Sequence, residues 1–251
     1  MRGFMLTKSN GVFQRYARHI YSRIRDQLIG GVTHCATNEK IAALTFDDGP
    51  NPIYTPQVLA VLAQYRAKAT FFMIGEHIRQ HLDVARAVQA DGHAIANHTY
   101  THHNLAGCSE AQVRIELAEC QRALKMLLGE TGKLLRPPYG SYDTSAAWIA
   151  QVQGYRMVLW SASGEDWRGD DATLVAQRVL AQTQPGGIVL LHDGWNTAHS
   201  SKAEQDLKPD RTQTVRALGL FLPTLLAQGY QFVTVTDMLT RVGARPVRKK
   251  Y

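Results

Sequence analysis

The 251-residue sequence lacks the patterns of several common protein classes. Its three cysteines are odd in number and show no Cys-x-x-Cys spacing, which argues against a disulfide framework and against a cysteine-ligated zinc site. No apolar run approaches the roughly 20 residues that span a bilayer, so we expect no transmembrane helix. There is neither a Gly-x-Gly-x-x-Gly after the first strand-like segment nor a Gly-Lys-Ser/Thr loop, so nucleotide binding has no support.

The N-terminal segment also lacks the pattern of a secretory signal. Residues 11–29 interleave Arg, His, Gln and Asp and contain no apolar stretch of about 7–15 residues. This absence favours a cytoplasmic location over export but leaves the compartment open, and the odd number of cysteines fits a reducing compartment. Apolar residues recur in this segment at nearly helical spacing between arginines, which fits an amphipathic helix either at a membrane surface or packed against the domain.

The positive charge lies at the two ends of the chain. The formal net charge is +7, yet residues 1–31 carry six Lys or Arg and one Asp, and residues 241–251 carry five Lys or Arg and no acid. Each end thus contributes +5, and the body between them carries −3. This distribution favours solvated basic termini over a nucleic-acid-binding domain. We predict a basic, helical N-terminal extension over 1–37, one folded domain over 38–240, and a basic tail over 241–251.

From residue 41 onward, strand-like segments alternate with helical ones. We expect strands at 41–47, 69–75, 93–98, 133–137, 156–162, 186–192 and 231–236. Helical periodicity is found at about 56–66, 77–90, 110–128, 144–153, 172–183 and 212–228. This alternation predicts an α/β fold with a mostly parallel sheet, either open and doubly wound or closed into a barrel.

Two adjacent carboxylates end the first predicted strand. The apolar run stops at Asp47 and Asp48, and Gly49-Pro50 follows as a turn signal. Successive strand side chains point to opposite faces, so both acids share one environment only if the strand breaks there into its loop. We expect two acids with different roles at the carboxyl end of a buried strand, where α/β folds place their chemistry. The alternative is a turn whose carboxylates cap backbone N–H groups.

Polar residues also follow the other predicted strands. His98 and His102, spaced i and i+4, meet on one face of a helical turn and would form a metal site with one carboxylate, unless they are a chance pair in a His-rich segment. Arg136 can pair bidentately with a carboxylate, and Asp166 can orient and charge His192. All these residues fall at one edge of the predicted sheet, which favours a common site.

Five ordered segments resemble the motifs of the polysaccharide deacetylase family, also called the NodB-homology domain or carbohydrate esterase family 4. They are Thr-Phe-Asp-Asp-Gly at 45–49, His-Thr-x-x-His at 98–102, Arg-Pro-Pro-Tyr at 136–139, Asp-Trp at 166–167 and Leu-x-His at 190–192. The similarity spans about residues 38–240. It implies a distorted (β/α)7 barrel of mostly parallel strands, similar to a TIM barrel. The implied reaction is hydrolytic removal of acetyl groups, mostly from N-acetylglucosamine-containing polymers or oligomers such as peptidoglycan or chitooligosaccharide.

The resemblance also implies catalytic roles. Three residues would hold a divalent metal, usually Zn2+, with Co2+ as another that would fit: Asp48, His98 and His102. Asp47 would be the general base, oriented by Arg136. His192 would be the general acid, tuned by Asp166.

The same resemblance implies the binding surface. The backbone N–H of Tyr139 would stabilise the oxyanion, and Trp167 with Leu190 would form the walls of the acetyl-methyl pocket. Ser163 stands where the family usually has a further Asp, which puts the support of the Arg136 loop or the substrate rim in question. Four aromatic residues are candidates to line a sugar-binding groove: Tyr139, Tyr142, Trp167 and Trp195.

Two alternative functions stay open at this point. The same metal site would also suit an O-acetyl xylan or a small non-sugar amide. A catalytically silent glycan-binding or nucleic-acid-binding protein is the alternative of another class. We expect an acetylated poly- or oligosaccharide as partner, with no nucleic acid and with room for membrane-surface contact through the N-terminal extension. The sequence does not set the oligomeric state.

Overall fold

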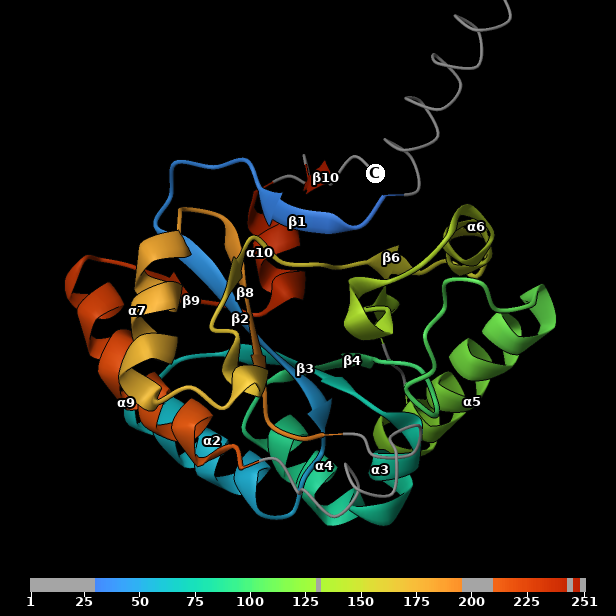
Figure 1. Ribbon diagram of the computed structural model, residues 1–251, viewed down its shortest axis with the longest axis horizontal. Coiled ribbons are helices and arrows are strands. Elements are labelled where there is room, and N and C mark those ends of the chain that lie inside the picture. The colour runs from blue at the N-terminus through green and yellow to red at the C-terminus, as the bar shows by residue number, and fades with distance from the viewer. Residues whose placement is uncertain (1–29, 130–131, 196–209, 243–245, 249–251) are drawn as a thin grey trace, which may run out of the picture.

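The computed structural model describes residues 30–129, 132–195, 210–242 and 246–248. Most of the predicted N-terminal helical extension lies outside these residues. In the described part, seven mutually parallel strands form the wall of a nearly closed barrel (Figure 1). These strands are β2 (Ile41–Gly49), β3 (Ala69–Met73), β4 (Ala94–Asn97), β5 (Leu134–Leu135), β6 (Arg156–Met157), β7 (Ala162–Ser163) and β8 (Gly187–His192). The predicted fold class is confirmed.

The strand order around the barrel is β6-β5-β4-β3-β2-β8-β7. Strand β1 (Val32–Cys35) spans the opening between β6 and β8, because it pairs antiparallel with β8 and forms a bridge from Val32 to Val158. Strand β10 (Pro246–Arg248) pairs antiparallel with β1, and β9 (Gln231–Phe232) pairs parallel with the start of β2. Segments near both ends of the chain therefore contribute to the sheet.

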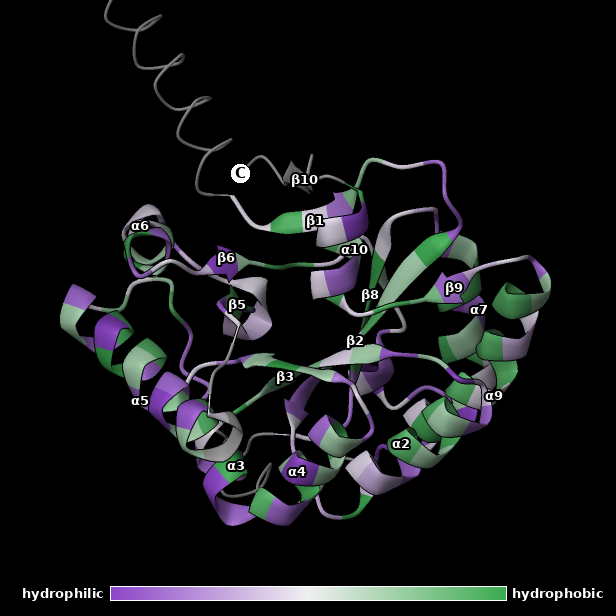
Figure 2. Ribbon diagram, turned by 180° about the vertical axis from the view of Figure 1, so that it is seen from behind, coloured by the Kyte–Doolittle hydropathy of each residue, from purple (hydrophilic) through white to green (hydrophobic). Residues whose placement is uncertain are grey.

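Helices surround the barrel on its outer face (Figure 1). They are α2 (Tyr54–Gln64), α3 (Gly75–Gln80), α4 (Leu82–Ala90), α5 (Glu110–Leu128), α6 (Thr144–Val152), α7 (Ala172–Gln182) and α9 (Thr212–Ala227). The helix α10 (Val235–Arg241) instead packs at the amino ends of the strands. Figure 2 shows that the helices are mixed in hydropathy, with hydrophobic and hydrophilic residues alternating along each helix. Among the described helices, none is both long and apolar enough to cross a membrane.

Three predicted elements differ in detail from the structure. The helix expected over 77–90 is two helices, because His81 between α3 and α4 takes a non-helical backbone at φ −132° and ψ 54°. The strand expected over 156–162 is two short strands, β6 and β7. The strand expected over 231–236 ends at Phe232, because the Thr234 side chain accepts a hydrogen bond from the Asp237 N–H and caps α10.

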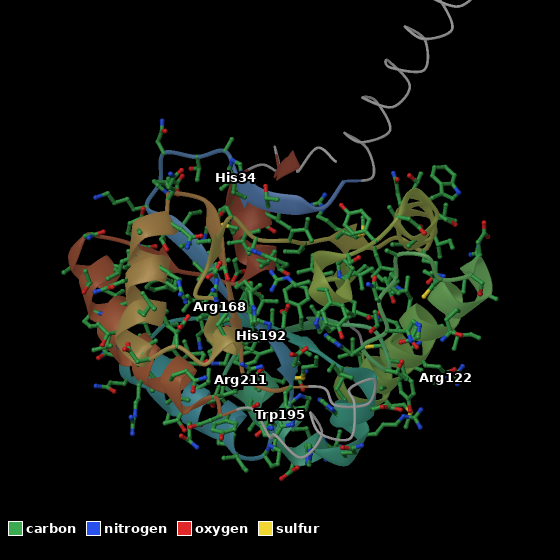
Figure 3. All side chains as sticks on the ribbon, in the orientation of Figure 1. His34, Arg122, Arg168, His192, Trp195 and Arg211 are labelled. Atoms are coloured by element: carbon green, nitrogen blue, oxygen red, sulfur yellow. The ribbon has the colours of Figure 1, made fainter. Side chains whose placement is uncertain are left out.

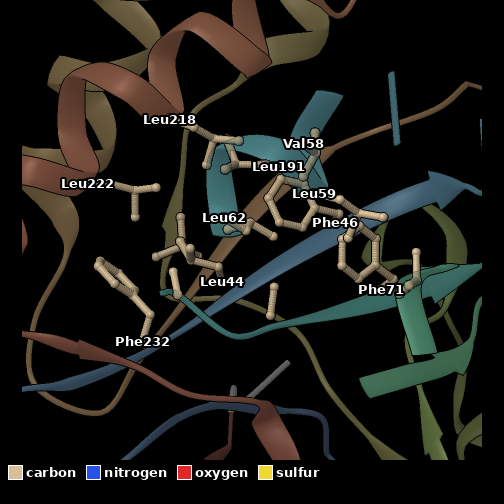
Figure 4. Packing of buried hydrophobic residues seen from close by; sticks show 14 of the residues in the cluster. Leu44, Phe46, Val58, Leu59, Leu62, Phe71, Leu191, Leu218, Leu222 and Phe232 are labelled. Atoms are coloured by element: carbon tan, nitrogen blue, oxygen red, sulfur yellow. The ribbon is translucent and has the colours of Figure 1, made fainter. Parts of the chain in front are cut away.

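Strand β2 divides its side chains between two environments. Leu44 and Phe46 point outward and pack against helices α2 and α9, as Figure 4 shows. Ala43 points inward to a second apolar cluster that includes Met238 of α10. Burial of a large apolar side chain such as Leu44 or Phe46 stabilises the fold by roughly 1.5–3 kcal/mol. The inward row of β2 continues through Thr45 to residue 47, so packing of the core fixes which face the first carboxylate takes.

Candidate active site

Asp47 and Asp48 lie where β2 breaks into its loop. Asp48 has a φ of 71°, and the pairing of β2 with β3 shifts register between Asp47 and Gly49. Because of this break, both carboxylates face one imidazole: the Nε2 atom of His98 is 3.8 Å from Asp47 Oδ2 and 3.4 Å from Asp48 Oδ1. Both acids are buried, as expected for a strand that ends at this point.

Asp48, His98 and His102 form a compact cluster. The Oδ1 atom of Asp48 lies 3.0 Å from His102 Nε2, and the possible ligand atoms of the three residues all lie within 4.8 Å of one another. His98 Nδ1 is 2.7 Å from the carbonyl oxygen of Arg136. A carbonyl can only accept, so Nδ1 carries a proton, and Nε2 is the ring nitrogen that faces Asp48.

This cluster fits a divalent cation. Burial alone would raise the pKa of Asp48, but His102 and His98 outweigh it and hold that pKa well below its usual range, so the carboxylate is ionised. Apart from these two imidazoles, the buried Asp48 Oδ1 has no hydrogen-bond partner among the described residues. Two imidazoles and one carboxylate are a ligand set of open metal sites, in which further positions remain for water and substrate.

Arg136 holds Asp47 from behind the cavity. Its side chain is fully buried, and Nη1 donates to Asp47 Oδ1 at 2.7 Å and to Thr45 Oγ1 at 2.8 Å. The expected bidentate pairing is wrong, because Nη2 and Nε donate to the carbonyl oxygens of Leu159 and Val158 instead. Burial lowers the pKa of Arg136, and Asp47 opposes that shift. The guanidinium therefore fixes one oxygen of Asp47 and leaves the other facing His98.

Asp166 and His192 form a second buried pair across the mouth of the barrel. His192 Nδ1 lies 2.8 Å from Asp166 Oδ1, and the His192 backbone N–H donates to Asp166 Oδ2 at 2.8 Å. The Thr214 hydroxyl donates to the same Oδ2 at 2.7 Å. Burial alone would lower the pKa of His192, but the Asp166 carboxylate outweighs it and raises that pKa. The pair therefore favours a protonated imidazole.

These groups line one cavity of about 360 Å³. Its walls comprise Asp47, Asp48, His98, His102, Tyr139, Gly140, Trp160, Trp167, Leu190, His192 and Arg211. The structure thus brings together eight of the ten site residues named from the sequence, and the other two, Arg136 and Asp166, contact them from behind. Tyr139 and Trp167 are 67% and 48% exposed, so they form the rim rather than the floor.

Sequence reasoning missed three residues that line this cavity. Gly140 has a φ of 63°, and a Cβ there would lie 2.7 Å from the Trp160 ring, so glycine allows the close approach of the two. Arg211 precedes α9 and donates through Nε to the Gly194 carbonyl oxygen at 2.8 Å. Figure 3 shows Arg211 and His192 close to each other near the centre of the molecule. Trp160 lies within the strand predicted at 156–162, but no motif marks Arg211.

Two of the four aromatic groove candidates lie outside the cavity. Trp195 contacts the ring of Tyr54, with 5.7 Å between centroids, and the Tyr142 hydroxyl accepts a hydrogen bond from the Gly31 N–H. The Trp167 ring instead lies 5.3 Å from that of His192. Ser163 turns its hydroxyl toward its own loop, where it accepts from the Glu165 N–H at 3.1 Å.

The comparisons with known proteins agree with this geometry. The family model described as polysaccharide deacetylase matches residues 34–158. A peptidoglycan-N-acetylglucosamine deacetylase of Bacillus cereus is 40% identical over 204 residues, which cover 80% of this chain and 89% of the relative. A chitooligosaccharide deacetylase of Sinorhizobium fredii is 36% identical over 79% of this chain and 92% of the relative. The chain belongs to the polysaccharide deacetylase family, and because these relatives are named as deacetylases, which hydrolyse amides, the predicted family and enzyme class are confirmed.

Solved structures extend the likeness to the whole fold. The crystal structure of a peptidoglycan N-acetylglucosamine deacetylase bound to 4-naphthalen-1-yl-N-oxidanyl-benzamide has a TM-score of 0.76 and 32% identity, with 87% of this chain and 95% of that chain covered. A pseudoenzyme of carbohydrate esterase family 4 from Bacillus anthracis has a TM-score of 0.72 and 26% identity, with 82% and 68% covered. Since the fold also carries a pseudoenzyme, the residues in the site decide what each member can do.

Proposed function

We propose that this protein is a zinc-dependent hydrolase that removes N-acetyl groups from N-acetylglucosamine-containing poly- or oligosaccharides and releases acetate. One observation carries the proposal. Asp47 stands beside the cluster of Asp48, His98 and His102, and these four residues line the same cavity as His192. The buried Arg136 holds Asp47 from behind. The relatives named as peptidoglycan and chitooligosaccharide deacetylases support the choice of substrate.

The cluster supplies the electrophilic side of the reaction. Asp48, His98 and His102 would hold the cation, which when bound lowers the pKa of water toward about 7 and polarises an acetamide oxygen. The His98 Nδ1 contact with the Arg136 carbonyl oxygen, at 2.7 Å, fixes the ring so that Nε2 faces the site. Asp48 stays ionised because the neighbouring imidazoles keep its pKa low.

Asp47 is the general base in this proposal. Its Oδ1 accepts from Arg136 Nη1, so Oδ2 is the oxygen available to take a proton from the attacking water. The Thr45 hydroxyl shares the same Nη1 and donates in turn to the Val189 carbonyl oxygen at 2.6 Å. The base is therefore held by a buried hydrogen-bonded chain rather than by solvent.

His192 is the general acid. Because Asp166 raises its pKa, the imidazole is available in the protonated form that can donate to the departing amine. Leu190, Trp167 and the Tyr139 loop would surround the acetyl group, and the Tyr139 N–H would donate to the oxyanion. Tyr139 has a φ of 60°, a left-handed backbone that a tight turn at the cavity rim requires.

The test is acetate release from a panel of acetylated substrates. Zinc-loaded protein is incubated with N-acetylated chitooligosaccharides, peptidoglycan, acetylxylan and a small acetamide, and the loss of acetyl groups is followed by mass spectrometry. The proposal predicts loss of acetyl groups from one or both of the first two, with none from Asp47→Asn. Release of acetate from acetylxylan or the small acetamide alone would reject the proposed substrate and favour an O-acetyl ester or a small amide instead. No release from any substrate would reject the proposal.

A further inference from the structure

Both proposed histidine ligands lie on one irregular loop, whose backbone conformation needs stabilising contacts from the rest of the fold. Residues 98–102 follow β4 directly, and Thr99 and His102 have φ values of 67° and 62°. A left-handed backbone is costly for these residue types, especially for the β-branched Thr99, and persists only when its surroundings fix it. The contacts around the loop should therefore reveal what fixes the two imidazoles.

The carbonyl side of the loop is held by the start of α3. The N–H groups of Gly75 and Glu76 donate to the carbonyl oxygens of Thr99 and Tyr100, both at 3.0 Å. A side chain on Gly75 would collide with the Tyr100 ring. The Asn97 side chain accepts from the Thr99 N–H at 2.8 Å. These contacts leave the N–H groups of the next two residues to be satisfied.

Glu116 of α5 satisfies them. Its Oε2 accepts from the N–H groups of Tyr100 and Thr101, both at 2.9 Å. Its Oε1 accepts from the Thr101 hydroxyl at 2.7 Å and from the Gln112 side chain at 3.3 Å. Glu116 is only 2% exposed. Among the described residues, the arginines of α5 pair with Glu110 and Glu119 rather than with Glu116. Three of its four donors belong to the 98–102 loop, so this buried carboxylate mainly holds that loop.

We propose that Glu116 is a positioning residue that presets His98 and His102 for the cation. The inference rests on the proposed function, because it concerns the same metal site. Helix α5 is itself held in place at two points. Ser109 caps its first turn, and the carbonyl oxygen of Leu117 in α5 accepts a hydrogen bond from the Asn97 side chain at 3.1 Å. Partners that orient metal ligands typically contribute about 10- to 100-fold in metal affinity.

Two substitutions separate the geometry of Glu116 from its charge. Glu116→Gln removes the charge, but its amide oxygen can still accept from the N–H groups of Tyr100 and Thr101. Its NH2 group can donate to the Thr101 hydroxyl, and to the Gln112 side-chain oxygen once that amide has flipped. Glu116→Asp keeps the charge but withdraws the carboxylate by one methylene, so it can no longer reach every donor. Glu110→Ala is the matched control on the same helix, where Glu110 is exposed and pairs with Arg114.

The measurements are zinc affinity, by competition with a chromophoric chelator, and the visible absorption of the cobalt-loaded protein. Thermal unfolding of the metal-free variants is followed alongside. We expect Glu116→Asp to bind zinc about 10- to 100-fold more weakly with an altered cobalt spectrum, and Glu116→Gln and Glu110→Ala to remain within a few-fold of the parent.

The outcomes separate this inference from the proposed function. If Glu116→Asp binds zinc as tightly as the parent, or if Glu116→Gln is the weaker binder, Glu116 does not position the ligands. Either result leaves the proposed catalytic roles intact. If the parent protein binds no divalent metal at all, the proposed function fails and this inference fails with it. A loss of thermal stability without a change in zinc affinity would mark Glu116 as purely structural and would also overturn the inference.

Discussion

The two ends of the barrel are built from the same strands but have opposite chemistry. At the amino ends, Ile41 of β2 packs with Val233 and with Met238 of α10 in an apolar cluster. At the carboxyl ends, the same sheet presents carboxylates and imidazoles to one cavity. Parallel strands make this contrast possible, because every strand turns its carboxyl end toward the same rim. Whether a polar residue belongs to the cavity or to the structural core therefore depends more on the rim at which it lies than on its residue type.

Two histidines illustrate the contrast. His93 lies just before β4, at the amino-end rim, where its Nδ1 accepts from the Ala69 N–H at 3.2 Å. Burial and the nearby Lys68 lower its pKa to about 4, so it is a neutral structural residue. His192 ends β8 at the other rim, and there Asp166 raises its pKa against the effect of burial. One partner group separates a structural imidazole from a reactive one.

The largest effect on activity should come from replacing a histidine at the carboxyl-end rim, compared with replacing one at the amino-end rim. We expect His98→Ala to lose bound zinc and to reduce acetate release by more than about a hundredfold, because it removes a ligand of the open site. His93→Gln is the control, since its amide oxygen can still accept from the Ala69 N–H. Metal analysis and acetate release measure both variants. The comparison breaks down if His98→Ala keeps its zinc and turnover, or if His93→Gln loses them.

A smaller effect is expected from Asp166→Asn. Without the carboxylate, the pKa of His192 falls, and less of the imidazole is protonated at a given pH. Because a general acid acts in its protonated form, the alkaline limb of the kcat profile should move to lower pH, with kcat reduced by about 10- to 100-fold. Thr214→Val, which removes one donor to Asp166 but leaves its charge, should shift the limb less. An unmoved limb in Asp166→Asn would contradict the role of this pair.

The smallest effect concerns stability rather than turnover. The pKa of His93 falls from 6.5 to about 4 in the folded protein, so the unfolded chain takes up the proton first. His93 therefore contributes stability that is present above about pH 6.5 and is lost as the pH falls toward 4. His93→Gln should flatten the pH dependence of the free energy of unfolding in this window, as measured by chemical denaturation. An unchanged slope would show that His93 does not titrate in this way.

Much of the fold could be predicted from the sequence, because apolar periodicity and strand-ending motifs are local signals. The alternation of strand side chains predicted that Asp47 and Asp48 share one site only if the strand breaks there, and the structure has that break at Asp48. Contacts between distant segments carry no such signal. The pairing of β1 with β10 joins residues near the two ends of the chain, and Arg211 reaches the cavity only because α9 begins beside β8.

The same limit applies to the supports of the site. Glu116 lies within an ordinary helical pattern, and only the structure brings it to the loop of His98 and His102. The bidentate pairing expected for Arg136 was wrong because the positions of backbone carbonyl oxygens cannot be predicted from residue types. Residues that line the cavity were thus easier to predict than the residues that hold them in place.

The account depends most on a division of labour between two adjacent carboxylates, one at the cation and one taking the proton. The direct test is Asp47→Asn, which can still accept from Arg136 but cannot act as a base. We predict that kcat for acetate release falls by at least about a hundredfold while one zinc ion per chain remains bound. A variant that retains both its zinc and full turnover would contradict the account.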